Sequence, residues 1–169
     1  MGVTLGQHAV DDKSNEITAV ETILQQLVLE GRIVTMDALL TQRHVAQTIL
    51  DKGGDYVMIV QENPPRLLAD IARVCTLPPI GDRQDTARTV DIGHGRIAQR
   101  NVTTSEALLG SSDWPGLAQV FALGRHVITQ KTGRERVDVV SGVTSLSPAR
   151  ATPERLLALV RGQWQIENK

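Results

Sequence analysis

Residues 33–42, IVTMDALLTQ, hold the feature on which the fold prediction depends, a strand-like apolar run that ends on a carboxylate. Residues 33–36 suit a buried strand, and a helix-like stretch follows Asp37. A charge is costly to bury unless something pairs with it. Asp37 therefore either caps the residues that follow or lies where a metal ion or a substrate compensates its charge.

The segments around this stretch alternate between strand patterns and helical stripes. Such alternation predicts an α/β domain with parallel strands, whose ligands lie beyond the carboxyl ends of the strands. Asp37 occupies such an end. In chain order the sequence predicts strands over residues 3–10, 32–38 and 55–60, and helices over 19–31 (ended by Gly31), 41–54 (with Thr41 as N-cap) and 64–75.

The second half of the chain has a different pattern. Residues 81–147 contain a turn-rich start and then β-type runs over 89–104, 117–130 and 136–146. We interpret this block as a β-rich insertion that follows an α/β half of residues 1–80. A closing helix is predicted within residues 148–169, where Thr152 can cap it and Pro153 can open it.

The closing helix carries a second unexpected carboxylate. Leu156, Val160 and Trp164 are spaced by four residues and form an apolar stripe. Glu167 follows Val160 by seven residues, which places it on the same inward face of a regular helix. The alternative is a frayed chain end that leaves Glu167 in water, and the residues alone do not separate the two.

Length and composition predict one globular domain. The chain has 169 residues, of which 41% are hydrophobic and 22% are charged, as in ordinary folded domains. No apolar run approaches the roughly 18 residues of a membrane helix. The single cysteine, Cys75, offers neither a disulfide nor a metal cluster and is interpreted as a small buried hydrophobe. A cytoplasmic location without membrane contact fits these features.

Charge is distributed unevenly along the chain. Residues 1–80 carry six basic and ten acidic side chains, whereas residues 81–169 carry twelve and nine. Contact with a polyanion is therefore expected in the second half, although the net charge of −1 is not that of a dedicated nucleic-acid binder. A predicted hairpin turn at residues 131–133 gathers basic side chains for DNA contact, and a solvated basic turn is the alternative. These side chains are Arg125, Lys131, Arg134 and Arg136.

Most catalytic motifs are missing from the sequence. The four histidines lack metal-ligand spacing, no serine lies in a nucleophile elbow, and Gly93-His94-Gly95 lacks the third glycine of a phosphate loop. An aromatic content of 2% gives no stacking platform for single strands. Asp37 and Glu167 remain. Paired carboxylates suit Mg²⁺, and two such ions can activate an attacking oxygen and stabilise a leaving one.

Six stretches of the chain, in the same order, resemble insertion-sequence transposases of the DDE class. The resemblance is strongest to the ISAs-type group, which includes the H-repeat-associated proteins. The stretches cover nearly all of the chain and are specific when taken together. They read LGQHAVDDKSNEITAV (5–20), GRIVTMDALLTQ (31–42), ILDKGGDYVMIVQENPP (49–65), GHGRIAQR (93–100), WPGLAQV (114–120) and TSLSPARATPERLLALVRGQWQIEN (144–168).

The resemblance implies an RNase H-like fold, in which three acidic residues bind Mg²⁺, or Mn²⁺ in its place, to cleave and transfer DNA strands. Asp37 matches the second acidic residue. Glu167 matches the glutamate of a tyrosine–arginine–glutamate–lysine signature, and Arg161, in the arginine relation, joins the expected DNA contacts. The implied partners are the DNA of the element ends and a homo-oligomer or full-length transposase.

The chain also departs from the family pattern. The strand with the first aspartate would lie before Met1, Val160 occupies the tyrosine position of the signature, and its lysine would lie beyond Lys169. Ala98 and Gln61 stand where the family commonly has glutamate and lysine. We therefore expect a truncated internal fragment that is inactive alone. A non-catalytic module that binds DNA or full-length transposase, and a chain with no present role, are the alternatives.

Overall fold

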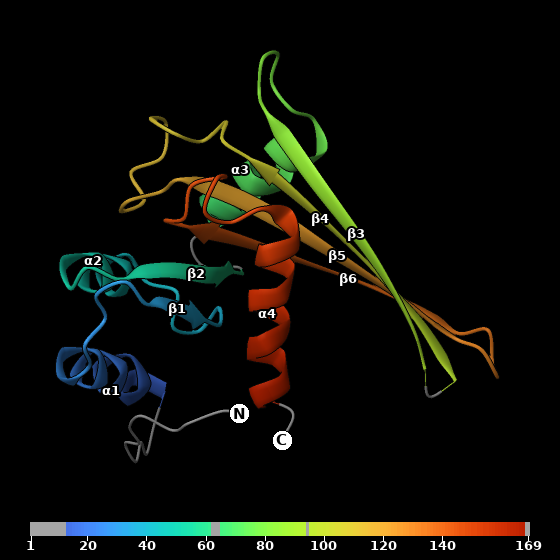
Figure 1. Cartoon of the computed structure of the whole chain (residues 1–169), viewed down its shortest axis with the longest axis horizontal. Coiled ribbons are helices and arrows are strands. Elements are labelled where there is room, and N and C mark those ends of the chain that lie inside the picture. The colour runs from blue at the N-terminus through green and yellow to red at the C-terminus, as the bar shows by residue number, and fades with distance from the viewer. Residues whose placement is uncertain (1–12, 62–64, 94, 168–169) are drawn as a thin grey trace.

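The computed structural model describes residues 13–61, 65–93 and 95–167 (Figure 1). In these residues helices and strands alternate in the first half, and four consecutive strands precede the last helix. The helices are α1 (Lys13–Gln26), α2 (Arg43–Asp51), α3 (Pro65–Thr76) and α4 (Pro153–Glu167), and the strands are β1 (Ile33–Met36), β2 (Asp55–Val60), β3 (Gln84–Gly93), β4 (Arg96–Ser105), β5 (Gln119–Thr129) and β6 (Glu135–Thr144).

The strands form a single six-stranded sheet in the order β1-β2-β6-β5-β4-β3. β1 and β2 are parallel, which confirms the prediction for the first half. The other pairs are antiparallel. Because β6 pairs with β2, through Val57 and Thr144 among others, the four later strands extend the sheet of the α/β half.

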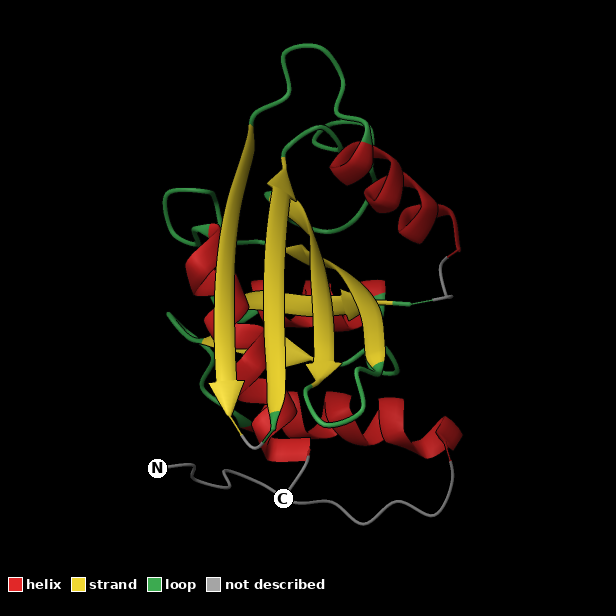
Figure 2. Ribbon diagram, turned by 90° about the vertical axis from the view of Figure 1, so that its right-hand side faces the viewer, coloured by secondary structure: helices red, strands yellow, loops and turns green. Residues whose placement is uncertain are grey.

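Helices cover both faces of one end of this sheet (Figures 1 and 2). α2 and α3 bury Val45, Ile49 and Ile71 against one face, and α1 adds Leu24 to the same cluster. α4 packs Leu156, Leu157 and Val160 on the other face, against residues of β2, β4 and β5. Both faces of β2 are therefore covered, and residues 56–60 are all buried, which explains their continuous apolar run.

The ends of β3–β6 that lie farthest from the helices form a projection, which we call the blade. It comprises residues 88–93, 96–101, 124–129 and 135–140 and extends to the right in Figure 1. The β5–β6 hairpin turns at residues 130–134, where Gly133 has φ 64° and its N–H donates to the Thr129 carbonyl (2.8 Å). The predicted turn at residues 131–133 is thereby confirmed.

Several predicted boundaries were wrong. Helix α1 ends at Gln26 rather than at Gly31, because the chain turns there to bury Leu29 and to place the Gly31 N–H on the Gly53 carbonyl (3.0 Å). The run over 89–104 is two strands joined by a tight turn, and the first of them begins at Gln84, inside the stretch expected to be turns. The strand expected over residues 3–10 lies outside the described residues.

The N-cap prediction for α2 was wrong by one residue. Gln42 holds the N-cap position without a side-chain hydrogen bond. The buried Thr41 donates its hydroxyl to the Asp37 carbonyl instead (2.7 Å). The caps of α4 were predicted correctly, since the Arg155 N–H donates to Thr152 Oγ1 (3.4 Å) and Pro153 begins the helix.

Candidate functional site

Asp37 lies directly after β1, at the carboxyl end of a parallel strand. Its Oδ1 accepts the Leu40 N–H (3.2 Å), so the carboxylate organises the turn before α2. Its Oδ2 has no hydrogen-bond partner in the described part of the chain, and the side chain is partly exposed. The capping interpretation is thus correct for one oxygen, while the other is a hard ligand that a divalent cation could use.

Helix α4 carries the second predicted site residue, Glu167, at its last position. α4 packs against β1 and β2, and the carboxyl end of β1 points toward it in Figure 1. The backbone of Glu167 ends this helix, but its side chain lies outside the described part. The pairing of Asp37 with Glu167 therefore remains a prediction. Among the side chains that are described, no group of three or more His, Cys, Asp or Glu could hold a metal ion.

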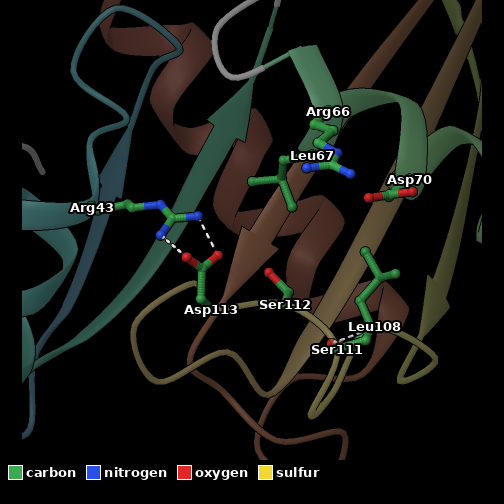
Figure 3. A pocket seen from close by; sticks show the side chains of 8 residues that line it. All are labelled: Arg43, Arg66, Leu67, Asp70, Leu108, Ser111, Ser112 and Asp113. Carbon is green, nitrogen blue, oxygen red and sulfur yellow. Dashed lines mark hydrogen bonds and ion pairs between the residues drawn. The ribbon is translucent and has the colours of Figure 1, made fainter.

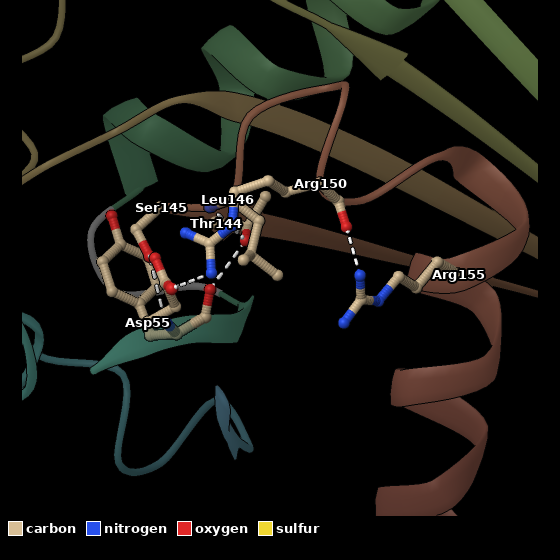
Figure 4. Close-up of polar contacts among 7 residues, drawn as sticks. Asp55, Thr144, Ser145, Leu146, Arg150 and Arg155 are labelled. Atoms are coloured by element: carbon tan, nitrogen blue, oxygen red, sulfur yellow. Dashed lines mark hydrogen bonds and ion pairs between the residues drawn. The ribbon is translucent and has the colours of Figure 1, made fainter. Parts of the chain in front are cut away.

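A polar network fixes the segment that leads into α4 (Figure 4). The carboxylate of Asp55, only 13% exposed, accepts hydrogen bonds from Ser145 Oγ (2.9 Å) and pairs with Arg150 (2.7 Å). Arg155, in the first turn of α4, donates to the Arg150 carbonyl (2.7 Å). These contacts connect the start of β2 with the chain between β6 and α4, and so help to set where α4 crosses the sheet.

Register places a row of arginines on the α4 side of the blade. Val102 and Leu123 are paired across β4 and β5 and belong to the cluster beneath α4. Side chains two residues apart on a strand share a face. The same face of the blade therefore carries four arginines, which we call the arginine face: Arg96 and Arg100 from β4, Arg125 from β5 and Arg136 from β6.

A hollow of about 380 Å³ opens on this face. Arg125, Arg134 and Arg136, which the sequence singled out, all line it, and Arg96 joins them. The fourth predicted basic residue, Lys131, lies exposed in the adjoining turn and is not part of the lining. Glu135 is the acidic residue among the lining side chains, so the hollow has an excess of positive charge.

Not all of these guanidinium groups are neutralised. Arg136 pairs with Asp138 (2.9 Å). Arg96, Arg125 and Arg134 form no ion pair within residues 13–61, 65–93 and 95–167, and Arg125 Nε is buried there without a hydrogen-bond partner. Arg125 is partly buried, whereas Arg96 and Arg134 are exposed. All three guanidinium groups can form charge-assisted hydrogen bonds with an anionic ligand.

Arg161 lies apart from the hollow. From α4 it reaches Asp91 on β3 (3.4 Å), and the same carboxylate oxygen of Asp91 also pairs with Arg100. Asp91 therefore ties α4 to the blade through two arginines. Asp91, Arg96 and Arg100 were not predicted from the sequence. Arg96, Ala98 and Arg100 share one face of β4, but the strand's register with its neighbours was needed to show which side they occupy.

A second hollow, of about 400 Å³, lies between α2, α3 and the segment before β5 (Figure 3). Arg43 and Asp113 form a two-pronged ion pair at one side, which raises the pKa of Arg43 and lowers that of Asp113. Arg66 and Asp70 line it from α3. Its two arginines and two aspartates balance in charge, so it does not select for an anion or a cation.

Cys75 and Tyr56 carry the thiol and the phenol that could act as reactive groups. Burial raises the pKa of the Cys75 thiol to about 11, so it is protonated at neutral pH, and Cys75 packs against the larger core cluster as expected. Burial also raises the pKa of Tyr56, whose hydroxyl donates to the Pro115 carbonyl (2.6 Å). Both groups serve the core.

The chain belongs to the transposase DDE domain family, whose sequence model matches residues 1–169. It is 29% identical over 174 residues to the "H repeat-associated putative transposase YhhI" of Escherichia coli (strain K12), covering 99% of this chain and 45% of that protein. The "Putative transposase YncI" of Escherichia coli O157:H7 is 30% identical over 173 residues, covering 99% and 44%. The chain thus spans less than half the length of these relatives. No helix in the described residues is both long and apolar enough to span a membrane.

Proposed function

We propose that this chain is the part of a DDE transposase that supplies two metal-binding carboxylates and a DNA-contacting surface for strand cleavage and transfer. One observation carries the proposal: Asp37 follows a parallel strand, one of its carboxylate oxygens has no hydrogen-bond partner among the described residues, and α4, which ends at Glu167, packs against that strand. In an RNase H-like arrangement β1, β2 and α4 would belong to the catalytic core. The proposal places the protein in the cytoplasm, with the DNA of element ends as its partner.

Asp37 and Glu167 would hold Mg²⁺, with Mn²⁺ as a substitute, because carboxylate oxygens are the ligands these hard cations prefer. Bound there, the metal would supply Lewis-acid stabilisation of the oxygens around a phosphodiester. The basic side chains Arg125, Lys131, Arg134, Arg136 and Arg161 would hold the DNA. Two carboxylates are one fewer than the family's three, so this chain alone is expected not to nick DNA, and a homo-oligomer or full-length transposase would complete the site.

Binding of Mn²⁺ to the purified chain tests the carboxylate pair. Titration followed by Mn²⁺ electron paramagnetic resonance should show a weak site that Asp37→Asn and Glu167→Gln each abolish. Asp51→Asn is the matched control, since Asp51 is an exposed carboxylate at the end of α2 that accepts a hydrogen bond from Gln47 Nε2 (2.8 Å). Equal Mn²⁺ binding by the wild type and Asp37→Asn would refute the metal assignment.

The alternative, a non-catalytic module that binds DNA or full-length transposase, shares the basic surface and differs at the carboxylates. Binding of duplex DNA without any Mn²⁺ site that depends on Asp37 would favour it. An incubation with element-end DNA and Mn²⁺ adds a second readout. Nicking above the level of Asp37→Ala would contradict the expectation that the chain is inactive alone.

A further inference from the structure

The two faces of the blade differ in chemistry. On the side of α3, Val90 is 51% exposed, and Ile92, Val137 and Val139 are each about 70% exposed. On the side of α4 lies the arginine face. In the register of the sheet, Val137 and Val90 flank His126 and Gln99 on one side, whereas Arg100 and Arg125 are direct neighbours on the other. A polyanion would therefore distinguish one face of the blade from the other.

Arg100 and Arg125 are like charges directly opposite each other across β4 and β5, an arrangement that destabilises a sheet unless something compensates it. Asp91 compensates Arg100. Asp138 is the direct neighbour of Arg125 on β6, yet its carboxylate binds Arg136 instead (2.9 Å). The charge of Arg125 is left open toward the hollow that Arg96 and Arg134 also line.

We infer that backbone phosphates of a nucleic acid bind in this hollow, on Arg96 and Arg125, and that the strand therefore lies along the α4 side of the blade. The inference rests on the proposed function and adds the face, the path and Arg96. Arg125 supplies a fixed guanidinium, because its Nε is already buried. Arg96 supplies an exposed guanidinium at the start of β4, next to the β5–β6 hairpin turn.

The position of α4 gives the path a direction. Arg161 of α4 and Arg100 of β4 are joined through Asp91, on the same side of the sheet as the hollow. Arg96 and Arg100 are four residues apart on β4, or roughly 13 Å in an extended strand. Basic groups thus continue from the blade tip toward α4, the helix that ends at Glu167. A strand held on the opposite face would meet the exposed valines and isoleucines.

Duplex binding by paired variants tests the face. Fluorescence anisotropy with a labelled 30-base-pair duplex would compare Arg96→Gln/Arg125→Gln with Arg66→Gln/Arg88→Gln. The control loses the same charge from the α3 side, where Arg88 donates to Gln99 (2.7 Å) and Arg66 is exposed on α3. We expect binding about tenfold weaker, or more, in the first double variant and less than twofold weaker in the control.

The salt dependence of duplex binding distinguishes the loss of a phosphate contact from a general loss of affinity caused by misfolding. Each lost phosphate contact lowers the log–log salt slope by about 0.9, so the first double variant should lose about 1.8 and the control nothing. Circular dichroism would verify folding, and Arg96→Glu, at an exposed position, provides a second variant if the double variant is unstable. Equal losses in both pairs, or an unchanged slope, would overturn the inference.

Two further arms identify the source of the phosphate. Thermal stabilisation by inorganic phosphate that requires Arg96 and Arg125, with duplex binding unaffected in the double variant, would indicate a site for the free ion and overturn the nucleic-acid assignment. A wild-type chain that fails to bind duplex at about 50 mM salt would overturn it too. Neither result alters the Mn²⁺ titration of Asp37, so failure here is distinguishable from failure of the carboxylate pair in the proposed function.

Discussion

The covered end of the sheet and the blade share strands β3–β6 but obey different constraints. β2 lies between helices on both faces, and its residues 56–60 are all buried. Beyond the helices the strands have no cover, and residues 88–93 of β3 are exposed or half-exposed throughout. Packing therefore governs the first region, whereas charge is free to serve binding in the second. Substitutions in the covered end should therefore mainly change stability, and substitutions in the blade should mainly change ligand affinity.

Two glycines give the largest expected effect. A Cβ on Gly142, in the covered part of β6, would lie 2.1 Å from Phe121 Cζ, whereas a Cβ on Gly124 in the blade meets nothing within 4 Å. Gly142→Ala should lower the free energy of unfolding by about 3 kcal/mol, because the ring must move within a packed core. Gly124→Ala should change it by less than about 0.5 kcal/mol. Urea unfolding followed by tryptophan fluorescence would measure both, and equal effects would contradict the contrast.

Two aspartates offer a second contrast, somewhat smaller. Asp55→Ala leaves Arg150 and Ser145 without the acceptor they share near the start of α4. We expect a loss of about 2 kcal/mol, since Asp55 is mostly buried. Asp138→Ala in the blade breaks one exposed pair with Arg136 and should cost at most about 1 kcal/mol. The same denaturation experiment applies. A larger loss for Asp138→Ala would show that the blade contributes more to stability than its exposure indicates.

The pH dependence should also come from the covered region. Burial raises the pKa of Cys75 from 9.0 to about 11. Between these values the unfolded chain has lost a thiol proton that the folded chain keeps, so the free energy of unfolding falls as pH rises. Cys75→Ala should reduce the fall in Tm between pH 9 and pH 11. This change in stability should be smaller than the loss expected for Asp55→Ala. Part of the fall should persist, because burial also raises the pKa of Tyr56. An unchanged profile would mean that Cys75 is solvated in the native state.

The covered region was predicted well because buried helices and strands have recognisable patterns of apolar residues in the sequence. The apolar run of residues 55–60 became β2 with the same bounds, and the helix predicted over residues 64–75 became α3 (Pro65–Thr76), shifted by one residue at each end. The predicted ends of helices were wrong where a tertiary contact determined where the helix ends. Gly31 looked like a helix end, but the contact of its N–H with Gly53 lies outside any local pattern.

The blade was harder to predict because exposed strands tolerate many residues. Its hairpin at residues 131–133 was found from local turn chemistry, while β3 was placed too late because residues 84–88 have no apolar pattern. Arg125 and Arg136 were identified from charge alone. Arg96 was not, since its role depends on pairing with Thr129, 33 residues away in the chain. Register is a property of the sheet rather than of any one strand.

Asp91 joins the two regions, and its substitution gives the smallest expected effect on DNA affinity. Its carboxylate holds Arg100 of the blade and Arg161 of α4. Asp91→Asn would remove one negative charge and release both guanidinium groups, so duplex DNA should bind about two- to fivefold more tightly at low salt. Stability should fall by about 2 kcal/mol, because Arg100 is only 12% exposed and loses the carboxylate that compensates its charge opposite Arg125.

The control for Asp91 is Asp70→Asn on α3, which removes the same charge from a pair with Arg73 on the other side of the sheet (3.6 Å). Anisotropy titrations would compare the two variants with the wild type at several salt concentrations. Tighter DNA binding by Asp91→Asn alone, with a steeper dependence of affinity on salt, would mean that the released arginines add phosphate contacts. If both variants gain equally, the effect comes from net charge alone, and Asp91 does not restrain the DNA-binding surface.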